Sequence, residues 1–67
     1  MSEFGDKLRQ SRIEASLTQQ AVADLLGVDR TTISYYETGK VVPKWHTLFK
    51  LSELYNVNID AFLTCLK

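Results

Sequence analysis

Several residue types that carry chemistry are scarce in this chain of 67 residues. With a single cysteine, Cys65, the chain cannot form an internal disulfide, which is typical of a reducing compartment. His46 is the one other soft ligand, so the sequence predicts no metal site. It also contains no Gly-rich phosphate loop, cysteine–histidine pattern or paired carboxylates. We therefore expect neither an enzyme nor a protein that binds a cofactor.

Long apolar runs are missing as well. No segment approaches the ~18 apolar residues of a membrane helix, and the N-terminus lacks the basic and then apolar order of a secretion signal. The length is enough for one small domain, and we expect that domain to cover residues 1–67. These observations favour a cytoplasmic protein without a membrane partner.

Proline and glycine number one and three, and no alternating apolar pattern is long enough to predict a strand. Apolar residues instead recur at helical spacing. Thr18, Asp29 and Asn58 each follow one apolar residue and precede another at the fourth helical position, which is typical of a capped helix start. Ser2 is a candidate cap for the first helix, whereas Lys44 is a weak cap for the fourth. The sequence therefore predicts an all-α domain with helices at about 2–15, 18–26, 29–38, 44–55 and 58–66.

The connection between the second and third predicted helices is very short. Only Gly27 and Val28 lie between the last helical residue and the next cap. Gly27 can adopt the left-handed conformation that ends a helix and turns the chain sharply. Two short helices joined by such a turn form a helix-turn-helix.

The stretch LTQQAVADLLGVDRTTISYYETGKVVP contains a recognisable set of residues: Leu17, Thr18, Gln19, Ala23, Gly27, Val28, Ile33, Ser34, Glu37, Gly39 and Pro43. As a set they resemble the helix-turn-helix of the lambda-repressor-like, or Cro and Xre, family of bacterial and phage regulators. The segment TLFKLSELYNVN resembles the fourth helix of that family, so the resemblance covers residues 4–63. It implies a compact five-helix fold and a transcriptional regulator, most often a repressor, that binds specific sequences of double-stranded DNA.

Two opposite charges are predicted to point inward. At about 100° per residue, Glu37 falls about 40° from Ile33 on the third helix, and Arg12 falls about 40° from Leu8 on the first. An unpaired buried charge costs several kcal/mol, so we expect an Arg12–Glu37 ion pair. The resemblance implies the same tie between the first and third helices. The alternative is that both charges are solvated at the surface.

The rest of the third helix is predicted to face outward. Between Arg30 and Lys50 the chain carries four basic residues against Glu37 alone, which suits a polyanion. A helix that enters the major groove with its N-terminal part would bring Arg30, Thr31 and Tyr35 to base edges. The residues predicted to contact phosphates are Gln19, Thr32, Thr38, Lys40 and Lys44, with Gln19 matching a glutamine that commonly holds the DNA backbone in the family. For each of these side chains the alternative is an ordinary polar surface residue.

The fourth predicted helix is apolar over more than half of its circumference, which is wider than one core face requires. We expect Trp45 to cover the core, and the surplus to form a two-fold homodimer contact that presents two recognition helices to a near-palindromic site. The residues predicted for that contact are Phe49, Leu54, Leu63 and Leu66. The rival hypothesis is a protein-interaction module, such as one that binds a toxin or another regulator through the outer face of the third helix.

Overall fold

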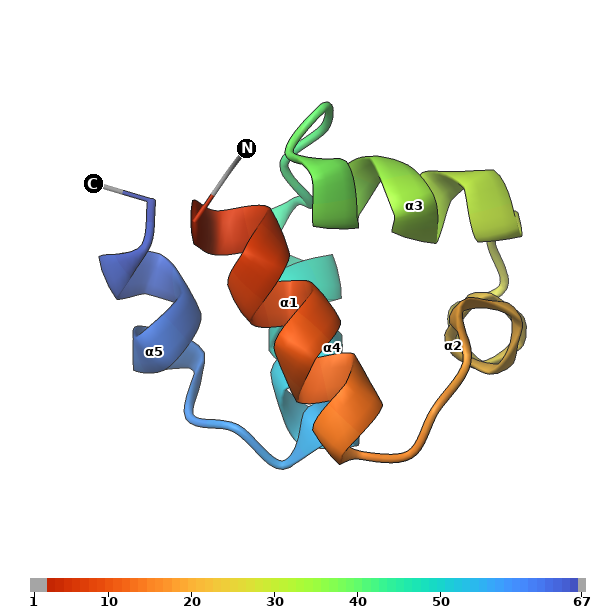
Figure 1. The fold of residues 1–67 in the computed structure, drawn as a ribbon, viewed down its shortest axis with the longest axis horizontal. Coiled ribbons are helices and arrows are strands. Elements are labelled where there is room, and N and C mark those ends of the chain that lie inside the picture. The colour runs from red at the N-terminus through yellow and green to blue at the C-terminus, as the bar shows by residue number, and fades with distance from the viewer. Residues whose placement is uncertain (1–2, 67) are drawn as a thin grey trace.

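The computed structural model describes residues 3–66, which form five helices arranged around one core (Figure 1). The helices are α1 (Glu3–Glu14), α2 (Gln19–Leu26), α3 (Arg30–Thr38), α4 (Trp45–Tyr55) and α5 (Ile59–Thr64). The predicted all-α, five-helix fold is confirmed, and no strand occurs among the described residues. Ser2, the cap predicted for the first helix, lies outside them.

Two of the three predicted helix caps form. The side chains of Thr18 and Asn58 each accept a backbone N–H of the following turn, at 3.0 and 2.9 Å. Asp29 has the extended backbone of a cap residue but makes no side-chain bond, so that part of the prediction is wrong. The N–H of Thr32 bonds to the Asp29 carbonyl instead, at 3.0 Å. Lys44, the weak cap of α4, also makes no such bond.

Backbone conformation and hydrogen bonding, rather than the spacing of apolar residues, determine where the helices end. Gly27 has φ 72°, as its predicted left-handed role requires, and ends α2. The last helix, α5, ends two residues before the predicted boundary at 66. The N–H groups of Cys65 and Leu66 bond to carbonyls three residues back, at 3.1 Å each, so the final turn tightens out of the α-helix.

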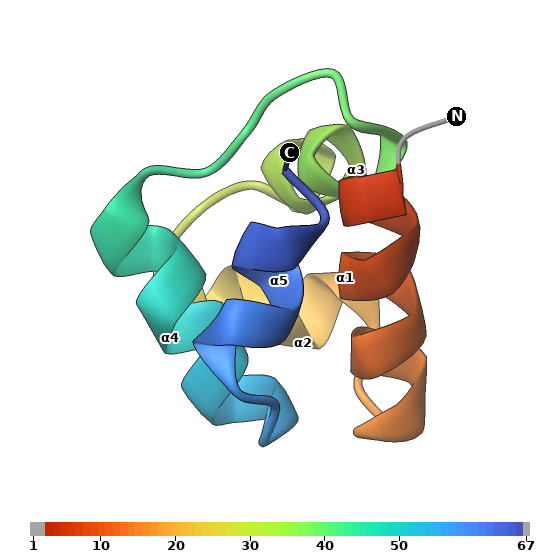
Figure 2. The same cartoon turned by 90° about the vertical axis from the view of Figure 1, so that its left-hand side faces the viewer.

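Helix α1 packs against α3, α4 and α5. In Figure 1, α5 lies on one side of α1 and α2 on the other, while α3 runs along one edge of the molecule with its N-terminal end close to α2. Figure 2 shows the segment that leads from α3 across the same edge to α4. The buried apolar residues come from all five helices: Phe4, Leu8, Val22, Ala23, Ile33, Leu48, Leu51, Tyr55 and Phe62.

A glycine allows α1 to approach α3 closely. A Cβ atom at Gly5 would overlap the carbonyl of Glu37 and would lie 3.1 Å from the backbone nitrogen of Gly39. Gly5 is itself buried. The start of α1 therefore packs directly against the end of α3, and this contact fixes the position of α3 relative to α1.

The expectation that Trp45 covers the core is wrong. Its side chain is 62% exposed at the first position of α4, and the preceding Val41 and Val42 are exposed too. The core is already filled from α4 by Leu48 and Leu51, one and two turns further along. No helix within residues 3–66 is long and apolar enough to cross a membrane.

Candidate nucleic-acid interface

The two faces of α3 differ sharply in character. Ile33 and Glu37 are buried against the rest of the molecule. Thr31, Tyr35 and Thr38 are exposed, with 38% of Tyr35 accessible to solvent. The orientation predicted by winding the helix is therefore present, and the outward face of α3 is available to a partner.

An ion pair holds the inner face of α3 in place. Arg12 in α1 donates from Nε to Oε2 of Glu37 at 2.6 Å and from a terminal nitrogen to Oε1 at 3.3 Å. The other terminal nitrogen of Arg12 donates to the carbonyl of Leu17 at 2.8 Å. Only 12% and 3% of the two side chains are exposed. The pair thus joins α1, the start of the helix-turn-helix and α3.

Gln19, the first residue of α2, extends this network to the surface. Its Nε2 donates to Oε1 of Glu37 at 3.0 Å, and its Oε1 accepts from Arg30 at 3.4 Å. Its side chain therefore connects a buried carboxylate with an exposed guanidinium at the first position of α3. Arg30 and Gln19 lie 11 residues apart in sequence, and winding the helices singly could not reveal this contact.

The C-terminal end of α3 brings three of the predicted residues together. The Thr38 hydroxyl donates to the carbonyl of Tyr35 at 3.3 Å. The ammonium of Lys40 lies 4.6 Å from the centroid of the Tyr35 ring. Lys44 is exposed at the start of α4, at the far end of the same loop. Thr32 is half-buried and lies in the first turn of α3.

The residues predicted for a dimer contact fall into two groups. Phe49 and Leu66 are 47% and 43% exposed. Leu54 and Leu63 are partly buried and pack against the core, which uses much of their surface within the monomer. The structure adds exposed apolar side chains that the sequence prediction did not include, above all Val41, Val42 and Leu25.

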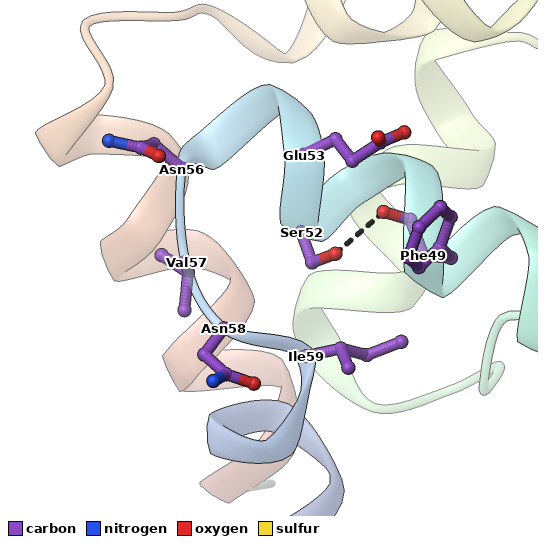
Figure 3. Close-up of a pocket in the computed structure, with 7 residues that line it drawn as sticks. All are labelled: Phe49, Ser52, Glu53, Asn56, Val57, Asn58 and Ile59. Atoms are coloured by element: carbon purple, nitrogen blue, oxygen red, sulfur yellow. Dashed lines mark hydrogen bonds between the residues drawn. The ribbon is translucent and has the colours of Figure 1, made fainter.

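A shallow depression of about 380 Å³ lies between α4 and the start of α5 (Figure 3). Inside it, the Ser52 hydroxyl donates to the carbonyl of Phe49 at 2.6 Å and so has a partner within its own helix. Within residues 3–66, no three His, Cys, Asp or Glu side chains lie close enough together to hold a metal ion. The residues that line the depression are Phe49, Ser52, Glu53, Asn56, Val57, Asn58 and Ile59.

Burial strongly affects the pKa of one titratable group, and the Arg12–Glu37 pair has smaller effects on it. Burial raises the pKa of the Tyr55 phenol, and the negative charge of Glu37 raises it further, whereas the positive charge of Arg12 opposes the rise. Tyr55 therefore stays protonated well into the alkaline range. It lies on α4, so the fourth helix also faces the Arg12–Glu37 pair.

A family model described as a helix-turn-helix domain matches residues 3–62. The chain belongs to this helix-turn-helix family. The resemblance to lambda-repressor-like regulators found in the sequence is thereby confirmed. In fold, this helix-turn-helix chain matches the P22 c2 repressor, solved with a synthetic operator in the presence of Tl⁺, with a TM-score of 0.82. The match has 24% sequence identity and covers 92% of this chain and 94% of the repressor chain.

Curated relatives of this helix-turn-helix chain include a transcriptional activator and a transcriptional repressor. The HTH-type transcriptional activator BcrR of Enterococcus faecalis is 42% identical over 62 residues, which are 92% of this chain and 30% of the relative. The cryptic phage CTXphi transcriptional repressor RstR of Vibrio cholerae is 41% identical over 61 residues, 91% of this chain and 55% of the relative. The chain thus spans about a third to a half of the length of these relatives.

Proposed function

We propose that this helix-turn-helix domain binds specific sequences of double-stranded DNA and regulates transcription, with repression as the expected outcome. The names of the relatives support a transcriptional regulator, and the fold is that of a repressor solved with a synthetic operator. The observation that carries the proposal is the two-sided character of α3. Its inner face is anchored by the Arg12–Glu37 pair, and its outer face presents polar and aromatic side chains.

The proposed base contacts come from the exposed side of α3. Arg30, at the first position of the helix, has the forked donor geometry that suits O6 and N7 of a guanine. Thr31 offers a methyl group and a hydroxyl, which suit a thymine methyl or a base-edge acceptor. Tyr35 lies one turn further on and contacts a thymine methyl or a flanking phosphate in this proposal.

The proposed phosphate contacts surround this face. Gln19 opens α2, where the backbone N–H groups and the positive end of the helix dipole favour an anion. Thr32 supplies a hydroxyl donor, and Thr38 supplies another once its hydroxyl turns away from the Tyr35 carbonyl. Lys40 and Lys44 supply positive charge from the loop that follows α3. Such contacts position the protein on the duplex without reading its sequence.

We further propose that the domain binds as a homodimer. Two copies of α3 would then reach successive major grooves, about 34 Å apart, on a near-palindromic operator. Exposed apolar side chains on and before α4 support this assembly, and Phe49 and Leu66 are the best placed of the predicted contacts. Leu54 and Leu63 would contribute only the part of their surface that the core leaves free.

Selection of bound sites from random duplex DNA tests the proposal. The wild-type domain should enrich a defined near-palindromic motif. Arg30→Ala should relax the preference at one base pair per half-site, at a cost of about 1–3 kcal/mol for the preferred base. Lys44→Ala is the matched control, because a lost phosphate contact should weaken binding to all sequences about equally. Recovery of random sequence by the wild-type domain would contradict the proposal.

A protein-interaction module is the second candidate function. The exposed Val41, Val42 and Trp45 follow α3 in the chain and would suit an apolar partner surface. Salt dependence separates the two functions. Binding that depends on phosphates loses affinity steeply with salt, with a log–log slope of about −0.9 for each phosphate neutralised. A flat salt dependence would favour the protein-interaction module.

A further inference from the structure

The backbone of Lys40 is tied to Tyr35. Gly39, with φ 80°, ends α3 in the left-handed conformation and turns the chain back over the last helical turn. As a result the N–H of Lys40 donates to the carbonyl of Tyr35 at 3.0 Å, and the N–H of Val41 donates to the same carbonyl at 3.3 Å. The start of the Lys40 side chain is therefore fixed relative to the helix that carries Tyr35.

The two side chains are also in contact. The Lys40 ammonium lies 4.6 Å from the centroid of the Tyr35 ring, within the distance of an attractive cation–π contact. Tyr35 is 38% exposed on the outward face of α3, where an uncovered ring would be free to change rotamer. A cation over one ring face favours one orientation and leaves the other face and the ring edge for a partner.

We propose that Lys40 is a positioning residue, which holds the Tyr35 ring in the orientation that reads one base pair. This inference rests on the proposed DNA binding of α3 and adds to it a role for a residue that otherwise only contacts phosphate. The ring face left open by Lys40 is apolar, and in the major groove the apolar feature of a base edge is the thymine methyl group. Tyr35 positioned in this way selects A·T over G·C at its base pair.

The two roles of Lys40 make different predictions about specificity. A lysine that only contacts phosphate changes affinity for every sequence by the same factor. A lysine that positions a reading side chain changes the ratio of affinities at one base pair. Lys44 is the matched control, because it lies in the same loop, whereas the cation–π contact found among residues 3–66 is made by Lys40.

The experiment compares the wild-type chain with Tyr35→Ala, Lys40→Ala, Lys40→Arg and Lys44→Ala. Site selection with Tyr35→Ala first identifies the base pair at which preference relaxes. Affinities are then measured for the selected site and for the same site with that base pair exchanged. Lys40→Ala should lower the ratio of these affinities about two- to five-fold, the range expected for an exposed cation–π contact. Lys40→Arg should keep the ratio, since arginine retains the charge over the ring, and Lys44→Ala should leave it unchanged.

Two results would overturn the inference while leaving DNA binding intact. One is a Lys40→Ala protein that loses affinity equally for both sites, as Lys44→Ala should. The other is a Tyr35→Ala protein that relaxes no base pair. A wild-type domain that selects no motif and shows no salt dependence would instead contradict the proposed function itself.

A measurement without DNA tests the contact directly. A lysine ε-methylene group over an aromatic ring shows upfield proton shifts in the NMR spectrum. We expect such shifts for Lys40 in the wild-type domain and their loss in Tyr35→Leu, with Lys44 unaffected. Lys40 shifts that match those of Lys44 in the wild-type domain would overturn the inference whatever the domain binds.

Discussion

Arg12 of α1 and Glu37 of α3 meet across 25 residues of sequence, with 2.6 Å between Nε and Oε2. Both charged groups also bond outside the pair. The guanidinium also donates to the Leu17 carbonyl, and the carboxylate also accepts from Gln19. Because Gln19 in turn accepts from Arg30, a continuous network connects the interior with the first residue of the proposed recognition helix. The geometry of α3 thus depends on a polar contact as well as on apolar packing.

The first prediction concerns the free energy of unfolding. Arg12→Ala would leave Glu37 buried and without its cation, which costs about 3–5 kcal/mol. We expect a loss of that order in urea or thermal unfolding of the domain. Arg9→Ala is the matched control, because Arg9 is exposed on the same helix and its loss should change stability by less than about 0.5 kcal/mol. A loss below about 1 kcal/mol for Arg12→Ala would contradict a structural role for the pair.

The second prediction concerns the close approach of α1 to α3. At an exposed position inside a helix, Gly→Ala would raise the free energy of unfolding by up to about 1 kcal/mol. At Gly5 the added methyl group would overlap the backbone of Glu37, so we expect a net loss of about 1–3 kcal/mol, as in other overpacked cores.

Asp6→Ala is the control for Gly5→Ala, because it adds the same helix-forming residue at an exposed neighbouring position of α1. Thermal unfolding of both variants checks the prediction. A Gly5→Ala protein as stable as the wild type would contradict the prediction, because it would mean that α1 and α3 can move apart without cost.

The elements of the fold could be predicted from the sequence because their signals are local. Thr18 and Asn58 cap helices through bonds within one turn, and Gly27 ends a helix by its own backbone conformation. The inward direction of Arg12 and Glu37 follows from helical spacing, and the cost of burying either charge alone then suggests their contact.

The features that sequence reasoning missed depend on how whole helices pack. Gly5 carries no local signal, since its importance comes from the backbone of α3 lying next to it. The expectation that Trp45 covers the core rests on the apolar preference of the family at that position, but the core beneath α4 is filled by Leu48 and Leu51. The bridge from Gln19 to Arg30 likewise requires the crossing of α2 and α3.

The third prediction concerns the exposed tryptophan. Since Trp45 is the one tryptophan of the chain and is 62% exposed, tryptophan fluorescence reports on the surface at the start of α4. If the proposed homodimer uses this surface, the emission should shift to shorter wavelength as protein concentration rises. Trp45→Ala should weaken self-association in sedimentation experiments but change the stability of the monomer by less than about 0.5 kcal/mol.

Ile13→Ala provides the control for Trp45→Ala, because Ile13 is also exposed, at 47%, but lies on α1 and is not part of the proposed contact. It should leave self-association unchanged. Sedimentation of the wild-type domain as a monomer at high micromolar concentration, with and without DNA, would contradict the proposed homodimer.

The fourth prediction concerns stability at alkaline pH. Burial, with a contribution from Glu37, raises the pKa of Tyr55 in the folded protein above the value of about 10 expected for an unfolded chain. Above pH 10 the unfolded state therefore loses the Tyr55 proton while the folded state keeps it. The contribution of Tyr55 to stability is complete below pH 10 and falls as pH rises beyond it, by at most about 1.4 kcal/mol per pH unit.

Tyr55→Phe isolates this contribution. It removes the titrating hydroxyl and keeps the buried ring, so the free energy of unfolding should fall less steeply above pH 10 than in the wild type. Tyr35→Phe leaves Tyr55 in place and should retain the wild-type slope. Urea unfolding at a series of pH values between about 8 and 11 provides the measurement, since that range spans the ordinary tyrosine pKa. Equal slopes for wild type and Tyr55→Phe would contradict the prediction, because the Tyr55 phenol would then ionise as readily in the folded protein as in the unfolded chain. Burial and the negative charge of Glu37 both oppose that ionisation.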